Sequence, residues 1–263
     1  MKLHNYLYIL LIYTVSFSAS AQQLTMASPE SLGFSSERLE LIGAVLEREI
    51  ANDRMPGAVV AIARHGKLAY YEAFGYLDKE AGIPMPKDAI FSIASMTKPI
   101  VSIGALMLFE QGLLMVNEPI GTYIPELEQR RVAINGDPSR TETAWRQPTE
   151  DLMRHTSGFT YGGRGITALH SIYPASSTSL AGPEFINILA GLPLHHQPGT
   201  TWDYSLGLDV LGVAIERISG QLLGDYLQEQ LFEPLGMVDT YFSIPAGKAS
   251  RHAQVLGNHP IFN

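Results

Sequence analysis

Residues 95–111 place the strongest constraint on the fold, because they form a helical stretch that is apolar on nearly every side. A helix without a polar face is normally covered by other parts of the chain. Gly112 follows the stretch and is a typical stop signal. The sequence therefore predicts a helix over 95–111, buried in a core that the surrounding segments supply.

The segments before this helix predict a second helix and a β-hairpin. Apolar residues recur at helical spacing over 39–50, after a serine at 35 or 36 that can cap the first turn. The apolar runs 58–63 and 68–76 flank a polar turn and predict two paired strands. A helix beside a hairpin favours a helix packed on an antiparallel sheet. Further helices are predicted over 183–190, 206–218 and 222–231, and a long irregular excursion over 125–148.

Composition limits the kinds of protein that the chain can be. Of the 263 residues, 46% are hydrophobic and 17% charged, which is typical of one globular core. The net charge of −8, without a basic run, argues against nucleic-acid binding. The absence of cysteine excludes disulfides, thiolate metal sites and a cysteine nucleophile. The histidines His195 and His196 lack acidic partners at ligand spacing, so we expect neither a metal nor an organic cofactor.

The N-terminal residues predict export. Lys2 precedes an apolar run over 7–17, and Ala19-Ser20-Ala21 offers the small residues of a signal-peptidase site. The apolar run is too short to span a bilayer comfortably, which argues against an uncleaved membrane anchor. We expect a signal peptide over 1–21 and one domain over 22–263, periplasmic or secreted, with no stable membrane insertion after cleavage.

Ser95 and Lys98 lie three residues apart at the start of the apolar helix, which puts both on one face. A helix N-terminus offers free N–H groups and a positive dipole end, which would stabilise an oxyanion and favour a neutral amine. A buried neutral lysine can accept a serine proton. A serine and a lysine at this spacing also occur by chance in chains of this size, so the helical context carries the prediction.

Tyr204 stands where a loop enters the helix predicted over 206–218. Taken alone it would be an ordinary core aromatic, but a phenol of lowered pKa beside Ser95 and Lys98 can act first as a general base and then as an acid. His155 lies in Arg154-His155-Thr156, and the chain contains no G-x-S-x-G elbow. We therefore expect His155 to order a loop through hydrogen bonds rather than to form a Ser-His-Asp triad.

Four motifs in order resemble the serine β-lactamase and D-alanyl-D-alanine peptidase superfamily over roughly residues 28–245. They are Phe91-Ser-Ile-Ala-Ser95-Met-Thr-Lys98, Met153-Arg-His155-Thr-Ser-Gly158-Phe, Pro198-Gly199-Thr and Tyr204-Ser-Leu206-Gly-Leu-Asp-Val-Leu-Gly212. The resemblance implies an α/β (α+β) fold of the β-lactamase/transpeptidase type, with an antiparallel sheet flanked by helices and an all-helical region. It also implies acyl transfer through Ser95, with Lys98 and Tyr204 as proton handlers.

Two departures from the superfamily pattern refine these expectations. Leu206 stands where β-lactamases and peptidases usually carry the asparagine of Y-x-N, and this is similar to the family VIII carboxylesterases. No K-T-G or H/W-x-G motif follows, since Lys248 precedes Ala249 and the chain ends at Asn263. We expect a fragment without the C-terminal strands, with an exposed hairpin edge and little activity, because losing one oxyanion donor costs about 10²–10³ in turnover.

Two other functions stay open at this point. A β-lactamase or D-alanyl-D-alanine carboxypeptidase would use the same residues on another acyl donor, and a non-catalytic penicillin-binding-like module would only bind cell-wall peptide or a partner. The expected ligand is a small-molecule ester, a β-lactam or a peptide. The sequence does not indicate the oligomeric state.

Overall fold

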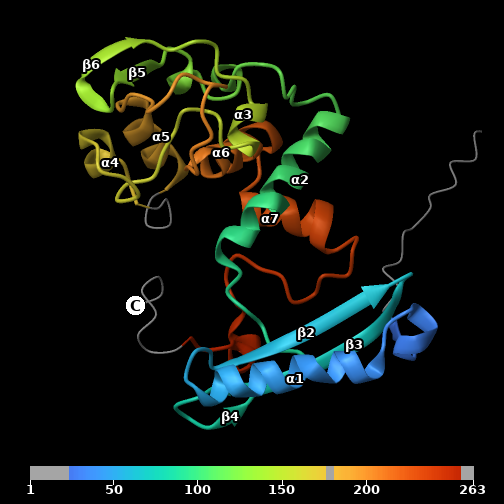
Figure 1. Cartoon of the computed structure of the whole chain (residues 1–263). Helices are drawn as coiled ribbons and strands as arrows, with labels where there is room; N and C mark the ends of the chain where they lie inside the picture. Colours follow the sequence, from blue (N-terminus) through green and yellow to red (C-terminus); the bar gives the residue numbers. More distant parts are fainter. Residues whose placement is uncertain (1–23, 176–180, 256–263) are drawn as a thin grey trace, which may run out of the picture.

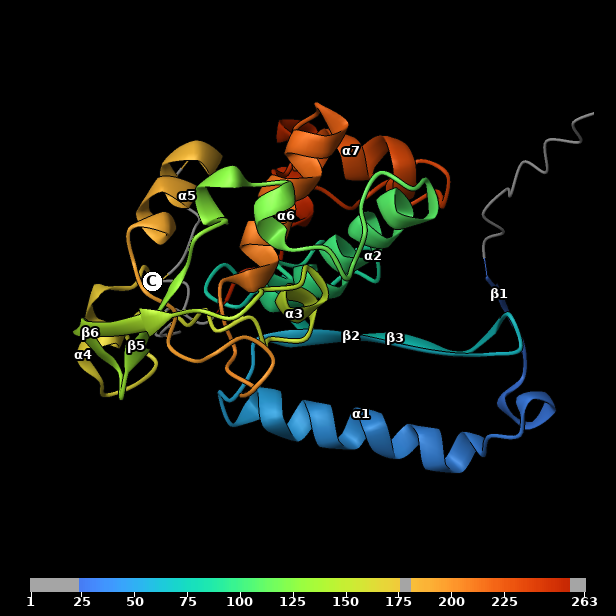
Figure 2. The ribbon, with the colours of Figure 1, turned by 90° about the horizontal axis from the view of Figure 1, so that it is seen from above.

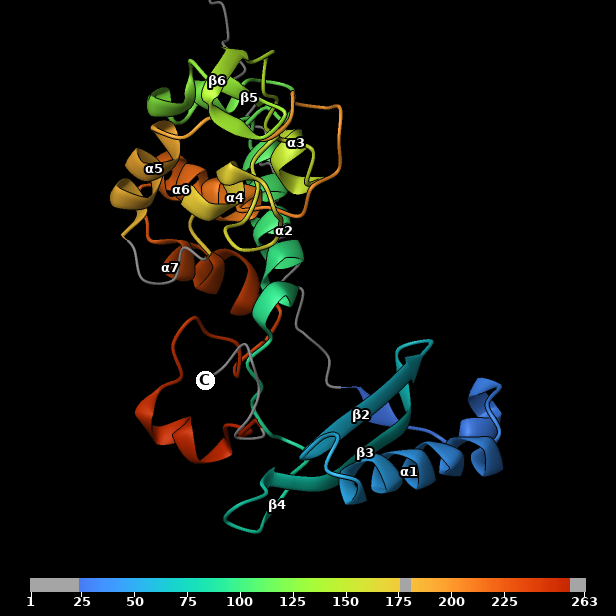
Figure 3. The ribbon, with the colours of Figure 1, turned by 60° about the vertical axis from the view of Figure 1, so that its left-hand side comes forward.

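The computed structural model describes residues 24–175 and 181–255, so the signal peptide predicted over 1–21 lies outside the described residues. A sheet layer and a helical region stand side by side, joined by the segment that leads into α2 (Thr97–Glu110) (Figures 1 and 3). Within the described ranges, no helix combines the length and apolarity needed to cross a membrane. The site described below lies where α2 begins.

The sheet layer is built on one antiparallel hairpin, β2 (Gly57–Arg64) and β3 (Lys67–Asp78). His65 and Gly66 both have positive φ, 52° and 71°, as a tight two-residue hairpin turn requires. On its other edge β3 pairs with the two short strands β1 (Thr25–Met26) and β4 (Ile83–Pro84). Among the described strands, the outer edge of β2 has no partner.

Helix α1 (Ser36–Ala51) runs along the hairpin, as Figure 2 shows from above. Ser35 caps it by accepting a hydrogen bond from the Arg38 N–H at 3.3 Å. Gly43 allows the ring of Phe74 to approach closely, because a Cβ at this position would lie 3.1 Å from the ring. The predicted helix and the predicted hairpin are both confirmed.

Within residues 24–175 and 181–255, the helical region contains five helices besides α2, and they surround a common core. They are α3 (Glu150–Met153), α4 (Ala168–Ile172), α5 (Gly182–Ala190), α6 (Gly207–Ser219) and α7 (Leu223–Leu227), the last continuing as a π-helical turn, η5 (Gln228–Phe232). Short 3-10 helices occur at η1 (Pro29–Leu32), η2 (Ala94–Met96), η3 (Ile120–Thr122), η4 (Pro125–Leu127) and η6 (Ala246–Arg251).

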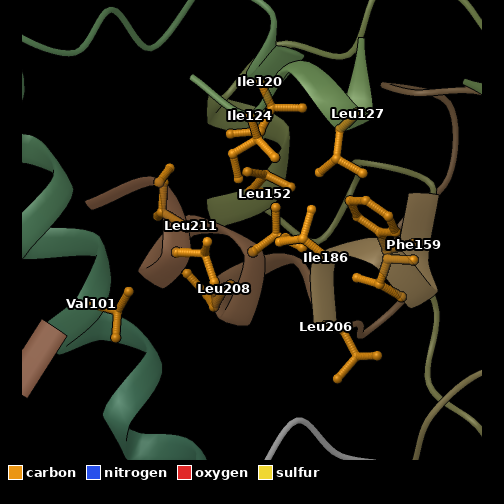
Figure 4. Packing of buried hydrophobic residues seen from close by; sticks show 14 of the residues in the cluster. Val101, Ile120, Ile124, Leu127, Leu152, Phe159, Ile186, Leu206, Leu208 and Leu211 are labelled. Carbon is orange, nitrogen blue, oxygen red and sulfur yellow. The ribbon is translucent and has the colours of Figure 1, made fainter. Parts of the chain in front are cut away.

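The core is centred on α6, of which eight residues are buried. Figure 4 shows Leu208 and Leu211 of α6 in one cluster with Ile186 of α5 and Leu152 of α3. Because α6 begins three residues after Tyr204, this cluster also fixes the position of the tyrosine. The helices predicted over 183–190 and 206–218 are confirmed.

Helix α2 is less buried than its composition predicts. Val101, Ala105 and Leu108 face the core, whereas Leu106 and Phe109 are 44% and 41% exposed. Within the described residues, α3, α6 and α7 pack against the helix and leave these side chains uncovered. The expectation that α2 is enclosed on all sides is therefore wrong for the part of the chain that the structure describes.

The segment 125–148 is more regular than predicted. It contains a second hairpin, β5 (Arg131–Ile134) and β6 (Asp137–Thr143), whose turn residues Asn135 and Gly136 have φ of 55° and 70°. An Asn-Gly pair is a strong hairpin signal. The sequence gives little sign of these strands, because most of their residues are polar and only Val132 and Ala133 of β5 are buried.

Candidate active site

Ser95 lies in η2, directly before the first turn of α2, and its side chain is exposed. Ala94 before it has φ of 45°, a left-handed conformation that costs an alanine about 1–2 kcal/mol. Strained backbone of this kind is often found at functional sites, where the surrounding structure maintains it. Lys98 lies one turn further on, with its amine nitrogen 3.5 Å from the Ser95 hydroxyl oxygen.

Tyr204 enters from the loop before α6 and completes a cluster with these two residues. The Lys98 nitrogen lies 4.9 Å from the centre of the Tyr204 ring. The Lys98 amine and the Ser95 hydroxyl both act on the phenol closely enough to lower its pKa. The structure thus brings together the three residues singled out from the sequence, although Tyr204 lies more than 100 residues after Ser95 and Lys98.

The charges in this cluster favour a reactive phenol. Burial alone would raise the pKa of Tyr204, but hydrogen bonds from Lys98 and Ser95 and the positive charges of Lys98 and Arg164 outweigh it and lower the pKa. Burial likewise lowers the pKa of Lys98, but its interactions with Tyr204 and Tyr161 outweigh burial and raise it. The direction of this shift opposes the expectation of a neutral lysine and favours an ammonium at Lys98, with Tyr204 as the better base.

His155 supports the loop that carries Tyr204, as its predicted role requires. Its Nδ1 accepts a hydrogen bond from the Ser205 N–H at 3.2 Å, and its carbonyl accepts one from the Asp203 N–H at 2.8 Å. Its ring lies 4.5 Å from the Tyr204 ring, centre to centre. Burial and the nearby Lys98 charge lower the pKa of His155, which favours the neutral imidazole that can accept this hydrogen bond.

Two neighbours of Tyr204 were not indicated by the sequence. The ring of Tyr161 stacks on the Tyr204 ring at 5.6 Å between centres. The guanidinium carbon of Arg164 lies 4.7 Å from the Tyr204 ring centre and 5.2 Å from that of Tyr161. No motif contains Arg164, and its approach to Tyr204 depends on how the 162–165 loop folds, so the sequence offered no signal for it.

The expectation that His195 and His196 lack an acidic partner is wrong. The His195 Nδ1 lies 3.1 Å from an Asp203 carboxylate oxygen, and the His196 Nε2 lies 3.8 Å from the same oxygen. His170 joins the group, so that one ligand atom each of His170, His195 and Asp203 lies within 4.8 Å of the others. The acid was missed because the chain folds back between 196 and 203. The contact holds the residue immediately before Tyr204.

A pocket of about 440 Å³ opens beside the first turn of α2, which carries Lys98. Lys98, His155 and Ser102 form its polar part, and the rest of its lining is apolar: Pro99, Ile103, Met153 and Leu208. Such a pocket can take a hydrocarbon group next to Lys98.

The fold and the Ser-Lys-Tyr cluster together define the class of active-site-serine proteins with a β-lactamase/transpeptidase-like fold. The chain belongs to the β-lactamase family within that class, because the model of that family matches residues 42–260. The fold class predicted from the motifs is thereby confirmed.

Two esterases are among the curated relatives. Esterase EstB of Burkholderia gladioli is 36% identical over 229 residues, covering 83% of this chain and 56% of that protein. Lovastatin esterase of Penicillium rubens is 30% identical over 218 residues, covering 80% and 54%. The chain thus spans about half the length of these relatives.

Solved structures agree on the fold. EstCE1, described as a hydrolase with promiscuous acyltransferase activity, superposes with a TM-score of 0.65 at 28% identity, covering 79% of this chain and 52% of that one. A class C β-lactamase also gives a TM-score of 0.65, at 19% identity, covering 84% and 57%. At that identity the second similarity concerns the fold alone.

Proposed function

We propose that this chain carries the acylating site of a serine hydrolase that acts on carboxylic esters. The observation that supports this most directly is the contact of Tyr204 with both Ser95 and Lys98, together with the lowered pKa of the phenol. A general base is effective when it is within hydrogen-bonding reach of the proton it takes and has a pKa close to the working pH. The interaction of Tyr204 with Ser95 supports the first condition, and the direction of its pKa shift supports the second.

The proposed reaction is a two-step acyl transfer. Tyr204, as phenolate, takes the Ser95 proton while the hydroxyl oxygen attacks the ester carbonyl. The phenol then gives this proton to the departing alkoxide, which leaves as the alcohol, while the acyl group stays bound to Ser95. In the second step Tyr204 takes a proton from water, whose oxygen attacks the acyl carbon. The bond to Ser95 breaks, the acid is released, and the phenol returns the proton to the Ser95 oxygen. Lys98 stays charged throughout and stabilises the phenolate.

Two observations favour an ester over a β-lactam or peptide. Leu206 is fully buried in the core, so the position that carries an amide in β-lactamases and peptidases offers no amide to the site here. The relatives with the higher identities include two named esterases. The residues over 1–21 support export as part of the same proposal.

The test compares acylation of the 263-residue chain by p-nitrophenyl butyrate and by nitrocefin, following p-nitrophenolate or opened nitrocefin and the mass added to the protein. We expect Ser95-dependent acylation by the ester at a higher rate than by nitrocefin. Ser95→Ala should reduce release at least about 10³-fold. Ester cleavage that survives Ser95→Ala would contradict the proposal, and faster acylation by nitrocefin would favour a β-lactamase.

A further inference from the structure

Arg164 is held over the proposed general base by a short, anchored loop. The Gly162 N–H donates to the Pro174 carbonyl at 2.9 Å, and the Gly163 N–H donates to the His170 carbonyl at 3.0 Å. Gly165 packs against the His170 ring so closely that a Cβ would lie 2.4 Å from it. These contacts fix both sides of Arg164 and place its guanidinium 4.7 Å from the centre of the Tyr204 ring.

The Arg164 charge has no acidic partner among the residues that the structure describes. Some arginines of this chain are paired with carboxylates, as Arg217 is with Glu126 at 2.7 Å and Arg251 with Asp239 at 2.7 Å. Others have no acid but bond to backbone carbonyls, as Arg64 does to Leu32 and Arg130 to Leu192. The nearest acid in sequence to Tyr204, Asp203, is occupied by His195. Arg164 is exposed and lies over the faces of Tyr161 and Tyr204, so its donors can reach a ligand beside the Tyr204 ring.

Two positive charges lie beside the Tyr204 ring, and the negative charge of Asp209 acts on the neighbouring Tyr161. The chain carries a net charge of −8, whereas Lys98 and Arg164 both flank the Tyr204 ring. Lys98 is engaged with the phenol and with Ser95, so Arg164 is the cation left to meet a ligand. A guanidinium binds a carboxylate through two parallel hydrogen bonds, which a neutral group cannot match.

We propose that Arg164 binds a carboxylate on the alcohol part of the substrate, so that the site prefers esters of hydroxy acids. This inference rests on the proposed function, in which Tyr204 returns its proton to the leaving oxygen. The leaving group must therefore lie beside Tyr204, and Arg164 stands over that same ring. The carboxylate accepts hydrogen bonds from the Arg164 guanidinium while the ester carbonyl lies at Ser95.

The experiment uses 3-carboxy-4-nitrophenyl butyrate and its methyl carboxylate ester, which share an acyl group and a chromophore and differ by one charge. The acylation rate constant divided by the substrate dissociation constant is measured for each from nitrophenolate release in single turnovers. We expect the 263-residue chain to prefer the carboxylate by about tenfold or more. Arg164→Gln should bring the ratio close to one. Arg164→Lys should leave an intermediate ratio, because lysine keeps the charge but cannot form the two parallel hydrogen bonds of a guanidinium.

The control is Arg38→Gln, which removes the same charge from an exposed position on α1 and should keep the wild-type ratio. Equal losses on both substrates in Arg164→Gln would overturn the proposal, since they would mean that Arg164 acts only through the pKa of Tyr204. Ser95-dependent release without a preference for the carboxylate would also overturn it and leave the proposed function intact. Release that persists in Ser95→Ala would instead contradict the proposed function.

Discussion

The Tyr204 phenol is subject to opposing influences, and its neighbours decide the outcome. Its partial burial disfavours the phenolate, whereas the Lys98 ammonium and the Ser95 hydroxyl favour it. The same contact acts in the opposite direction on Lys98, whose pKa is raised. The two shifts agree, because each partner stabilises the charged form of the other.

Lys98→Met keeps the length of the side chain and removes its charge, so the Tyr204 pKa should rise. If the phenolate is the base, acylation increases with pH until Tyr204 is fully ionised, and the variant should reach its plateau at a higher pH than the wild type. At neutral pH the acylation rate should fall about 10²–10⁴-fold. The measurement is the pH dependence of single-turnover p-nitrophenyl butyrate acylation.

The matched control is Lys67→Met, an exposed lysine on β3, which should leave both the rate and the pH dependence unchanged. A Lys98→Met variant that is slower but follows the wild-type pH dependence would show that the lysine does not set the Tyr204 pKa.

At the scale of elements, the site depends on two loops that meet behind Tyr204. Gly158, after His155, has φ of 84°, and its carbonyl accepts a hydrogen bond from the His195 N–H at 2.7 Å. A Cβ at Gly158 would lie 2.2 Å from the His196 carbonyl oxygen. The glycine is thus required both for its conformation and for the close approach of the 195–203 loop.

Gly158→Ala should destabilise the chain by about 3 kcal/mol, because backbone strain and a collision with backbone act together. Gly66→Ala is the matched control, because its φ is also positive, 71°, but nothing lies within 4 Å of the added Cβ. The free energy of unfolding should therefore fall by only about 1–2 kcal/mol. Urea unfolding of both variants measures the difference. An equal loss of unfolding free energy in the two variants would show that the contact between Gly158 and the His196 carbonyl does not restrict the side chain at position 158.

The elements that the sequence predicts correctly are those whose signals are local. The cap at Ser35, the apolar spacing of α1 and the turn between β2 and β3 each depend on a few consecutive residues. Other features depend on segments that meet only in the folded chain. They are the charge state of Lys98, the position of Arg164 and the pairing of His195 with Asp203. The serine, lysine and tyrosine were identified because their motifs are local, whereas their environment is not.

Over the whole molecule, burial is uneven between the two parts. The buried cluster lies entirely in the helical region, where α6 alone has eight buried residues. Helix α1 has two, Leu39 and Ile50, and no residue of β2 is buried. The sheet layer and the helical region are visibly separate in Figure 3. Stability should therefore differ between them.

Hydrogen exchange should show this difference directly. We expect the amides of α6 to exchange slowest, with opening close to global unfolding, and those of α1 and the β2 edge to exchange through smaller local openings. Mass spectrometry of peptides from 207–219 and 57–64 provides the comparison. Equal protection of both segments would indicate one cooperative unit rather than two parts of unequal stability.

The central claim is that Ser95, Lys98 and Tyr204 work as one acylating unit, and a double-mutant cycle on Lys98→Met and Tyr204→Phe measures this most directly. When two residues act as one unit, removing the second costs little rate once the first is gone. The double variant should therefore acylate within about threefold of the slower single variant. Losses that multiply in the double variant would show that the amine and the phenol act independently, and would contradict the account.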